Sequence, residues 1–274
     1  MQKRRTQNSY GDMKGSIQAL DFKQVSWRRI YSCRLTAHMG EIFVQNEVID
    51  NKGEKMKEPQ TCTGTNKILG ISGSPIKNGN IEQAINLIMQ NSTHEGKLVR
   101  LSNMKINPCI GCLKCDSTNQ CIQKDDMSPF LHEIRDAKAI IIGAFPTFKS
   151  INALSKTFIE RLYPLKHRYM LTRGKIGIGV VSGFRDSEKV EDYLRSVFDW
   201  FQMEYLGSLR IPGNAPCLSC AVEEDCPYSN VRIMYGPDKG RSPEMFHNIQ
   251  RETGVLEEAE LLGVRLDKRL QEIS

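Results

Sequence analysis

Apolar runs alternate with helical repeats along most of the chain. Several of the runs are continuous, as in AIIIGAF and KIGIGVVSG, and such runs are typical of parallel strands covered on both faces. Five runs predict strands, at residues 67–72, 97–102, 139–145, 175–183 and 204–211. Apolar residues at helical spacing predict helices at residues 81–91, 126–137, 154–163 and 188–201, and one long or two shorter helices within 243–273.

Strands that alternate with helices predict an α/β fold built on a doubly wound, five-stranded parallel sheet. Residues 67–274 are expected to form this domain, with a cysteine-rich loop inserted at 107–125 and a cysteine-rich C-terminal segment at 212–274. Residues 1–66 are polar and show no sustained period, so a poorly ordered N-terminal extension is expected. Translation from Met56 is the alternative explanation of this extension.

The net charge of +6 is confined to the N-terminal segment. Residues 1–34 hold eight Lys and Arg against two Asp, which leaves residues 35–274 formally neutral. A neutral body provides no broad field for nucleic-acid phosphates, so nucleic acid is not expected as a partner. The chain shows neither a run of about 18 apolar residues nor a secretory signal. A cytoplasmic protein without a membrane partner is therefore expected.

The first predicted strand runs through SGSPIKNGN directly into a helix, as an anion site requires. The helix N-terminus adds unpaired N–H groups and a partial positive charge. The side chains of Ser72, Ser74, Asn78 and Asn80 are candidate donors. Neither GxxxxGK[ST] nor GxGxxG is present, so a mononucleotide phosphate fits better than a dinucleotide pyrophosphate. An ordinary polar turn is the alternative.

Two more loops follow strands at the carboxyl edge, where ligands of such sheets bind. GAFPTFKS offers Pro146, Thr147 and Phe148 to a planar ring system, and VSGFRDSE offers Gly183 and Phe184. The alternative is that the two phenylalanines are core or rim residues.

Seven of the nine cysteines fall in two short clusters, and the first of them is the strongest chemical signal. PCIGCLKCDSTNQC spaces its cysteines x2, x2 and x5. Three ligands at successive x2 spacings crowd the tight tetrahedron of zinc, whereas a cubane cluster presents its iron atoms over a larger body. An iron–sulfur cluster is expected on Cys109, Cys112, Cys115 and Cys121, with zinc or reduced thiols as the alternatives.

The second cluster holds Cys217, Cys220 and Cys226. These thiols could bind zinc or a second cluster, with Cys33, Cys62 or His247 as a fourth ligand. A redox-active CxxC pair and ordinary surface thiols are equally compatible with the pattern. No Ser/His/Asp arrangement is recognisable, so no catalytic residue is assigned.

ILGISGSPIKNGN, the CxxCxxCx5C loop followed by KDDM, and PTFKSINALSKTFIERL resemble the iron–sulfur flavoprotein family. That family belongs to the NADPH-dependent FMN reductase-like group of flavodoxin-like folds. The resemblance covers residues 67–211 and implies FMN and a [4Fe–4S] cluster on the first cysteine loop. It implies FMN contacts from three loops, which adds Gly79, Ile81, Ser150 and Ser182 to the residues above.

The resemblance also implies a homodimer or homotetramer in which a partner's flavin lies across a subunit interface. Electrons would pass from a ferredoxin-like donor through the cluster, placed beside the flavin, and on to a small-molecule acceptor. Ile76, Ile81 and the PTF turn depart from the usual family residues, which removes side-chain contacts to the phosphate and a hydroxyl from the flavin pocket. The alternatives are an NAD(P)H-dependent FMN or quinone reductase with structural cysteines and a metal- or redox-sensing binding protein.

Overall fold

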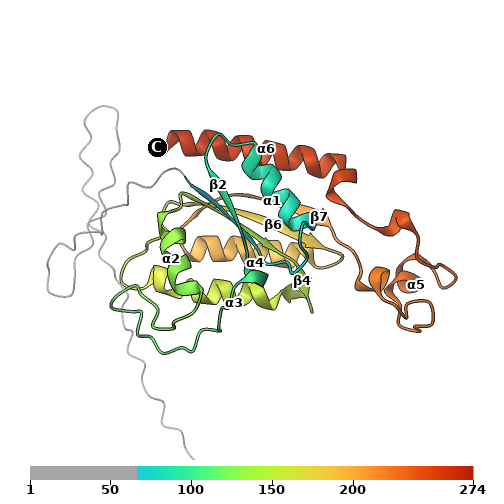
Figure 1. Cartoon of the computed structure of the whole chain (residues 1–274). Coiled ribbons are helices and arrows are strands. Elements are labelled where there is room, and N and C mark those ends of the chain that lie inside the picture. Colours follow the sequence, from blue (N-terminus) through green and yellow to red (C-terminus); the bar gives the residue numbers. More distant parts are fainter. Residues whose placement is uncertain (1–66, 274) are drawn as a thin grey trace, which may run out of the picture. The chain divides into compact units, whose positions relative to one another are not determined.

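A parallel sheet forms the centre of residues 67–273, which are the residues that the computed structural model describes (Figure 1). Its strands run in the order β2-β1-β3-β6-β7, which is the flavodoxin-like order with its switch point between β1 and β3. The predicted doubly wound parallel sheet is confirmed. The strands are β1 (Ile68–Ser72), β2 (Gly96–Arg100), β3 (Ala139–Ala144), β6 (Ile176–Gly183) and β7 (Glu204–Pro212). The predictions for the N-terminal extension, including Cys33, Cys62 and the start at Met56, lie outside the described residues.

Helices cover both faces of the sheet (Figure 1). One face carries α1 (Asn80–Gln90) and α6 (Thr253–Glu272). The other carries α2 (Met127–Asp136), α3 (Ala153–Arg161) and α4 (Ser187–Trp200). None of the helices within residues 67–273 is long and apolar enough to cross a membrane.

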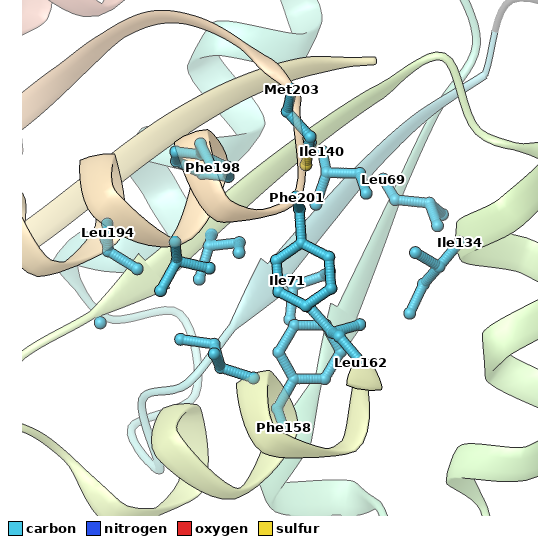
Figure 2. Close-up of a cluster of buried hydrophobic side chains, with 14 of the residues drawn as sticks. Leu69, Ile71, Ile134, Ile140, Phe158, Leu162, Leu194, Phe198, Phe201 and Met203 are labelled. Carbon is cyan, nitrogen blue, oxygen red and sulfur yellow. The ribbon is translucent and has the colours of Figure 1, made fainter. Parts of the chain in front are cut away.

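The alternation of side chains along each strand divides the core into two halves. Leu69 and Ile71 of β1 belong to the half beneath α2, α3 and α4, whereas Ile68 belongs to the half beneath α1 and α6. Figure 2 shows the first half, in which Phe158 and Phe198 approach the strands from α3 and α4. Burial of each such side chain contributes about 1.5 to 3 kcal/mol to the free energy of folding. The sheet is therefore a stable base for the loops at its carboxyl edge.

The long closing helix expected within residues 243–273 is present as α6, but the first part of that range is not α-helical. Only α6 is a long helix, and it begins at Thr253. The chain before it forms the short helix α5 (Asn230–Tyr235) and two 3-10 turns, Pro243–Met245 and Ile249–Arg251. Proline is favoured at the first position of a helix, which agrees with a turn that begins at Pro243.

Asp267 fastens α6 to the segment after α1. Its carboxylate accepts hydrogen bonds from the hydroxyl of Ser92 (2.9 Å), the backbone N–H of Thr93 (2.6 Å) and Nδ1 of His94 (3.1 Å). Partial burial alone would raise the pKa of this carboxyl, but these bonds outweigh it and lower the pKa from 3.8 to about 2.

A carboxyl with a depressed folded-state pKa stabilises the protein fully above its unfolded value. This contribution is therefore lost as the pH falls from about 4 towards 2. We expect Asp267→Asn to lower the melting temperature at pH 7 and to flatten its decline over this window. Thermal unfolding followed by circular dichroism at pH 7 and between about pH 4 and 2 checks this. A melting temperature that declines as steeply in the variant as in the wild type would contradict it.

Candidate functional site

The loop between β1 and α1 exposes unpaired backbone donors at the carboxyl edge of the sheet. Asn78 adopts a left-handed conformation (φ 54°), which asparagine tolerates better than most residues, and the chain then enters α1. No hydrogen bond among residues 67–273 uses the N–H of Lys77, Asn80 or Ile81. These donors surround the positive end of the α1 dipole, so the loop suits an anion.

Glu82, in the first turn of α1, fixes the backbone of this loop. Its side chain is 2% exposed and accepts hydrogen bonds from the N–H of Asn78 (2.9 Å) and from Nε of Arg100 (2.6 Å). The guanidinium also contacts the carbonyl of Pro75 and neutralises the carboxylate, so the floor of the loop does not repel an anion. The sequence analysis did not single out Glu82, although an acidic residue at the third helical position is a known capping signal.

We expect Glu82→Gln to lower the free energy of unfolding by about 2 to 4 kcal/mol, because it leaves Arg100 without its buried partner. Urea unfolding measures this. The matched control is Glu133→Gln, which breaks the exposed Lys97–Glu133 pair (2.6 Å) and is expected to cost less than about 1 kcal/mol. Equal losses in the two variants would contradict this role of Glu82.

Asn152 joins the loop after β1 to the loop after β3. Its side chain is 3% exposed, and its amide donates to the carbonyl of Gly73 (2.9 Å) and accepts from the N–H of Phe145 (3.2 Å). The residue precedes α3 but uses its side chain for this bridge instead of a helix cap. The sequence analysis did not find it, because its partners are distant along the chain.

The loop after β3 is a hairpin of β4 (Pro146–Thr147) and β5 (Ser150–Ile151). Its two tip residues, Phe148 and Lys149, both have positive φ (49° and 63°), a conformation that normally favours Asn and Gly. The Phe148 side chain is 99% exposed. It is therefore not a core residue, and both a rim position and a role against a ring system stay predictions.

The loop after β6 closes tightly against its neighbours. A Cβ on Gly183 would lie 2.5 Å from Cγ of Pro146, and the carbonyl of Gly183 accepts from the N–H of Gly213 (3.1 Å). Glycine is therefore required where β6 and the hairpin meet. Phe184 turns towards Ala215 and Leu218 of the C-terminal segment, so it is a partly buried residue.

The structure thus gathers the three loops predicted to bind FMN at one edge of the sheet, with two changes in side-chain roles. Asn80 does not offer a free amide, because it binds the carbonyl of His247 (3.2 Å) and the N–H of Ile249 (3.2 Å). The hydroxyl of Ser72 donates to Oε1 of Glu82 (3.5 Å), whereas that of Ser74 accepts from the N–H of Ile76 (3.1 Å) and can still donate its own hydrogen. Ser72 and Ile81 are buried, so Ile81 can offer only its backbone.

The first cysteine loop keeps its four thiols within electrostatic reach of one another. Partial burial raises the pKa of the Cys115 thiol, a backbone hydrogen bond lowers it, and the charges of Cys121, Cys109 and Cys112 raise it further. Among residues 67–273, no three Cys, His, Asp or Glu side chains converge as ligands of a single metal ion. An open hollow of about 860 Å³, lined partly by Cys121 and Asp125, lies within this loop.

A buried ion pair anchors the base of this loop. Arg161, at the end of α3, is 1% exposed and binds both carboxylate oxygens of Asp125 (2.6 and 2.9 Å) and the carbonyl of Asn107 (2.7 Å). Its Nη2 lies 3.6 Å from Sγ of Cys121. Burial alone would raise the pKa of Asp125, but the bonds from Arg161 and Asn107 outweigh it and lower that pKa. Both residues lie in the motifs KDDM and PTFKSINALSKTFIERL, but neither was assigned a role from the sequence.

Within one chain, Cys121 of the cysteine loop and the Asn152 bridge between the FMN loops lie at opposite ends of α3, and a cluster beside the flavin of a partner subunit stays a prediction. Cys121 contacts Arg161 at the C-terminal end of α3, whereas Asn152, at the N-terminal end, joins the FMN loops. Nine helical residues separate the two ends, a length of about 13 Å at 1.5 Å per residue. Asn119 further ties the cysteine loop to the carbonyls of Pro164 and Tyr169 (2.6 and 2.9 Å), beyond α3.

The second cysteine cluster lies in the segment after β7. Its three thiols are partly buried, and Sγ of Cys217 accepts from the backbone N–H (3.3 Å) and side-chain amide (3.5 Å) of Asn230. His247 pairs with Glu252 (2.9 Å), and its backbone binds Asn214, so its ring is not gathered with these thiols as a fourth ligand.

The fold and these sites agree with the chain's similarity to known proteins. The profile described as "NADPH-dependent FMN reductase" matches residues 66–216, so the chain belongs to that family. Within it, the chain is a member of the iron–sulfur flavoprotein family. The iron–sulfur flavoprotein of Methanocaldococcus jannaschii is 31% identical over 139 residues, which cover 49% of this chain and 71% of the relative.

Another iron–sulfur flavoprotein, from Archaeoglobus fulgidus, is 35% identical over 136 residues, or 48% of this chain. The match spans 61% of that relative, which is less than two thirds of its length. Among solved structures, RosB with bound 8-demethyl-8-formylriboflavin-5'-phosphate superposes with a TM-score of 0.53 at 12% identity, covering 76% of this chain and 79% of RosB. That likeness shows the fold.

Proposed function

We propose that the chain is an oxidoreductase that binds FMN at the carboxyl edge of the sheet and a [4Fe–4S] cluster on Cys109, Cys112, Cys115 and Cys121. One observation carries the proposal: the same chain holds an anion loop at the switch point of its sheet and a four-thiol loop anchored by a buried arginine. FMN supplies two-electron and one-electron redox chemistry, and a cluster supplies one-electron chemistry.

The residues of the anion loop fit a flavin phosphate. The N–H groups of Lys77, Asn80 and Ile81 face no other acceptor among the described residues, and Glu82 fixes the backbone that carries them. Thr147, Ser150, Ser182 and Gly183 lie on the two neighbouring loops, where they would contact the ring and the ribityl chain. Asn152 holds two of the three loops in a fixed relation.

The donor set of the cysteine loop fits a cluster. Thiolates bind metal, and burial, together with the smaller repulsion from the other three thiolates, raises the pKa of Cys115; the positive charge of bound iron would offset both effects. Arg161 brings a buried positive charge to Cys121, and its Nε has no hydrogen-bond partner among residues 67–273. That N–H remains for a cluster sulfur, and such bonds raise reduction potentials.

The contacts of the two proposed sites with opposite ends of α3 support an assembly of copies of the chain. We propose a homodimer or homotetramer in which the cysteine loop of one copy approaches the FMN loops of another. A ferredoxin-like protein would deliver electrons to the exposed thiol loop, and a small acceptor would receive them at the flavin. The cytoplasmic location expected from the sequence stays a prediction.

Anaerobic mixing of the oxidised full chain with reduced ferredoxin or with NADPH tests this route. We expect ferredoxin to bleach the flavin absorbance much faster than NADPH does. The Cys112→Ser/Cys115→Ser variant should keep its FMN but lose the fast phase with ferredoxin. Fast bleaching by NADPH that survives in this variant would instead favour an NAD(P)H-dependent FMN or quinone reductase with structural cysteines, to which the family description also points.

A further inference from the structure

The second cysteine segment repeats the pattern of the first. CLKCDSTNQC at residues 112–121 and CLSCAVEEDC at residues 217–226 share three cysteines and a leucine at the same spacing. In this register Asn214 stands at the place of Cys109, and Glu223 at the place of Thr118. The second segment therefore offers three thiols and a carboxylate, whereas the first offers four thiols, and the carboxylate does not stand at the place of the missing cysteine.

The backbone of the second segment places these four side chains at regular intervals. Successive i→i+3 hydrogen bonds run from Cys220 to Cys217 (3.2 Å), from Glu223 to Cys220 (3.4 Å) and from Cys226 to Glu223 (3.2 Å). In a 3-10 helix residues three apart lie on the same side, but only Pro216–Ser219 forms such a helix here, and the segment continues as separate turns. The four side chains do not converge on one ion site in the described residues, so to bind a cluster they would have to turn towards it.

Glu223 carries a polar atom that the fold itself does not satisfy. The side chain is 1% exposed, and Oε1 accepts from the hydroxyl of Ser229 (2.5 Å). Oε2 is buried and has no hydrogen-bond partner within the described residues, although Nε of Arg241 lies 3.5 Å away. The 3.5 Å ion pair with Arg241 compensates part of the cost of burying this oxygen, and the hydrogen-bonding capacity that remains agrees with a role as a ligand.

Positive charge and N–H donors surround the thiols. Arg241 donates to the carbonyl of Cys220 (3.1 Å), Arg232 donates to that of Cys226 (2.9 Å), and Asn230 donates twice to Sγ of Cys217. N–H···S bonds and nearby guanidinium groups stabilise thiolates and anionic clusters.

The segment also lies next to the proposed FMN site of the same chain. Cys217 packs with Phe184 of the β6 loop around a small apolar cluster of Ala215, Leu218 and Val231. Gly213, immediately before the segment, donates to Gly183. The first cysteine loop, in contrast, lies at the far end of α3.

We propose that Cys217, Cys220, Cys226 and Glu223 bind a second iron–sulfur cluster, with three thiolates and one carboxylate oxygen as its protein ligands. The inference rests on the proposed function, because the first loop is the precedent for the motif. The matched region of the family profile ends at residue 216, so this site is an addition outside that region.

Iron, acid-labile sulfide, zinc and FMN measured on the anaerobically reconstituted full chain test the proposal. We expect about seven to eight iron atoms per chain in the wild type and about four in Cys217→Ser/Cys220→Ser. After a gel-filtration step, Glu223→Gln should have lost at least half of the iron that the second segment binds in the wild type. The Ser219→Ala variant, which changes an exposed residue of the same segment, should match the wild type.

The first-loop variant Cys112→Ser/Cys115→Ser distinguishes the two proposals. If it retains about three to four iron atoms while the second-loop variant retains about four, both sites are established. About four iron atoms in the wild type, unchanged in the second-loop variant, would overturn the second site alone. Zinc in place of iron at the second segment would also overturn it. A folded wild type without iron or sulfide would overturn the proposed function itself.

The wild-type protein also gives a test that does not depend on variants folding. The electron paramagnetic resonance signal of the dithionite-reduced chain should integrate to about two spins per chain and show broadening from spin–spin coupling. About one spin per chain, with no broadening, would contradict a second cluster.

Discussion

Arg161→Ala is expected to lower the free energy of unfolding by about 3 to 5 kcal/mol, because it leaves the buried carboxylate of Asp125 without its partner. The same change removes the donor to Asn107 and the positive charge beside Cys121. We therefore also expect the cluster of the first loop to be lost faster in air and its reduction potential to fall. Urea unfolding and anaerobic potentiometry measure the two effects.

Arg161→Lys separates the structural part of this prediction from the electronic part. A lysine keeps the positive charge but cannot make the paired bonds to both oxygens of Asp125. We expect a free energy of unfolding between those of the wild type and Arg161→Ala. We also expect a cluster reduction potential closer to that of the wild type than in Arg161→Ala. Arg135→Ala is the matched control, because Arg135 pairs with Asp136 at the surface (3.1 Å, side chains 39% and 42% exposed). Unaltered cluster lability and potential in Arg161→Ala would show that the arginine does not act on the cluster.

Asn152→Ala is expected to weaken FMN binding by about 10- to 100-fold and to lower the free energy of unfolding by about 2 to 4 kcal/mol. The change leaves the carbonyl of Gly73 and the N–H of Phe145 without the buried partners that they have in the wild type. It also releases the loop after β1 from the hairpin after β3. Fluorescence titration of the apoprotein with FMN measures the affinity.

Asn152→Asp serves as the graded control for this prediction. Aspartate keeps an acceptor for Phe145 but brings a negative charge and no donor to the carbonyl of Gly73. Asn91→Ala, which removes one local bond to Leu87 (2.9 Å) at the end of α1, should leave FMN affinity unchanged. An FMN affinity in Asn152→Ala equal to that in Asn91→Ala would contradict the bridging role.

The fold was largely predictable because the strong signals are local. Apolar runs, some of them continuous as in AIIIGAF, identified all five strands of the sheet, and strand-to-loop transitions identified the three loops at its carboxyl edge. The four cysteines stood out for the same reason, since their spacing lies within a single short segment.

The residues that hold the site together could not be found in this way. Arg161 meets Asp125 from 36 positions away, and Asn152 meets Gly73 from 79 positions away. Such pairs depend on how helices pack on the sheet, and apolar periodicity does not encode them. The end of α3 that the cysteine loop contacts could not be predicted for a related reason, because a long insertion after β2 can lie along either end of that helix.

The metal, sulfide and FMN content of the anaerobically purified full chain tests the central claim most directly. The account predicts about one FMN, with at least about four iron atoms and four sulfides, per chain. It also predicts that Cys112→Ser/Cys115→Ser loses about four iron atoms and about four sulfides while keeping its FMN. A folded wild-type chain that holds FMN but no sulfide, or that holds zinc on the first cysteine loop, would contradict the account.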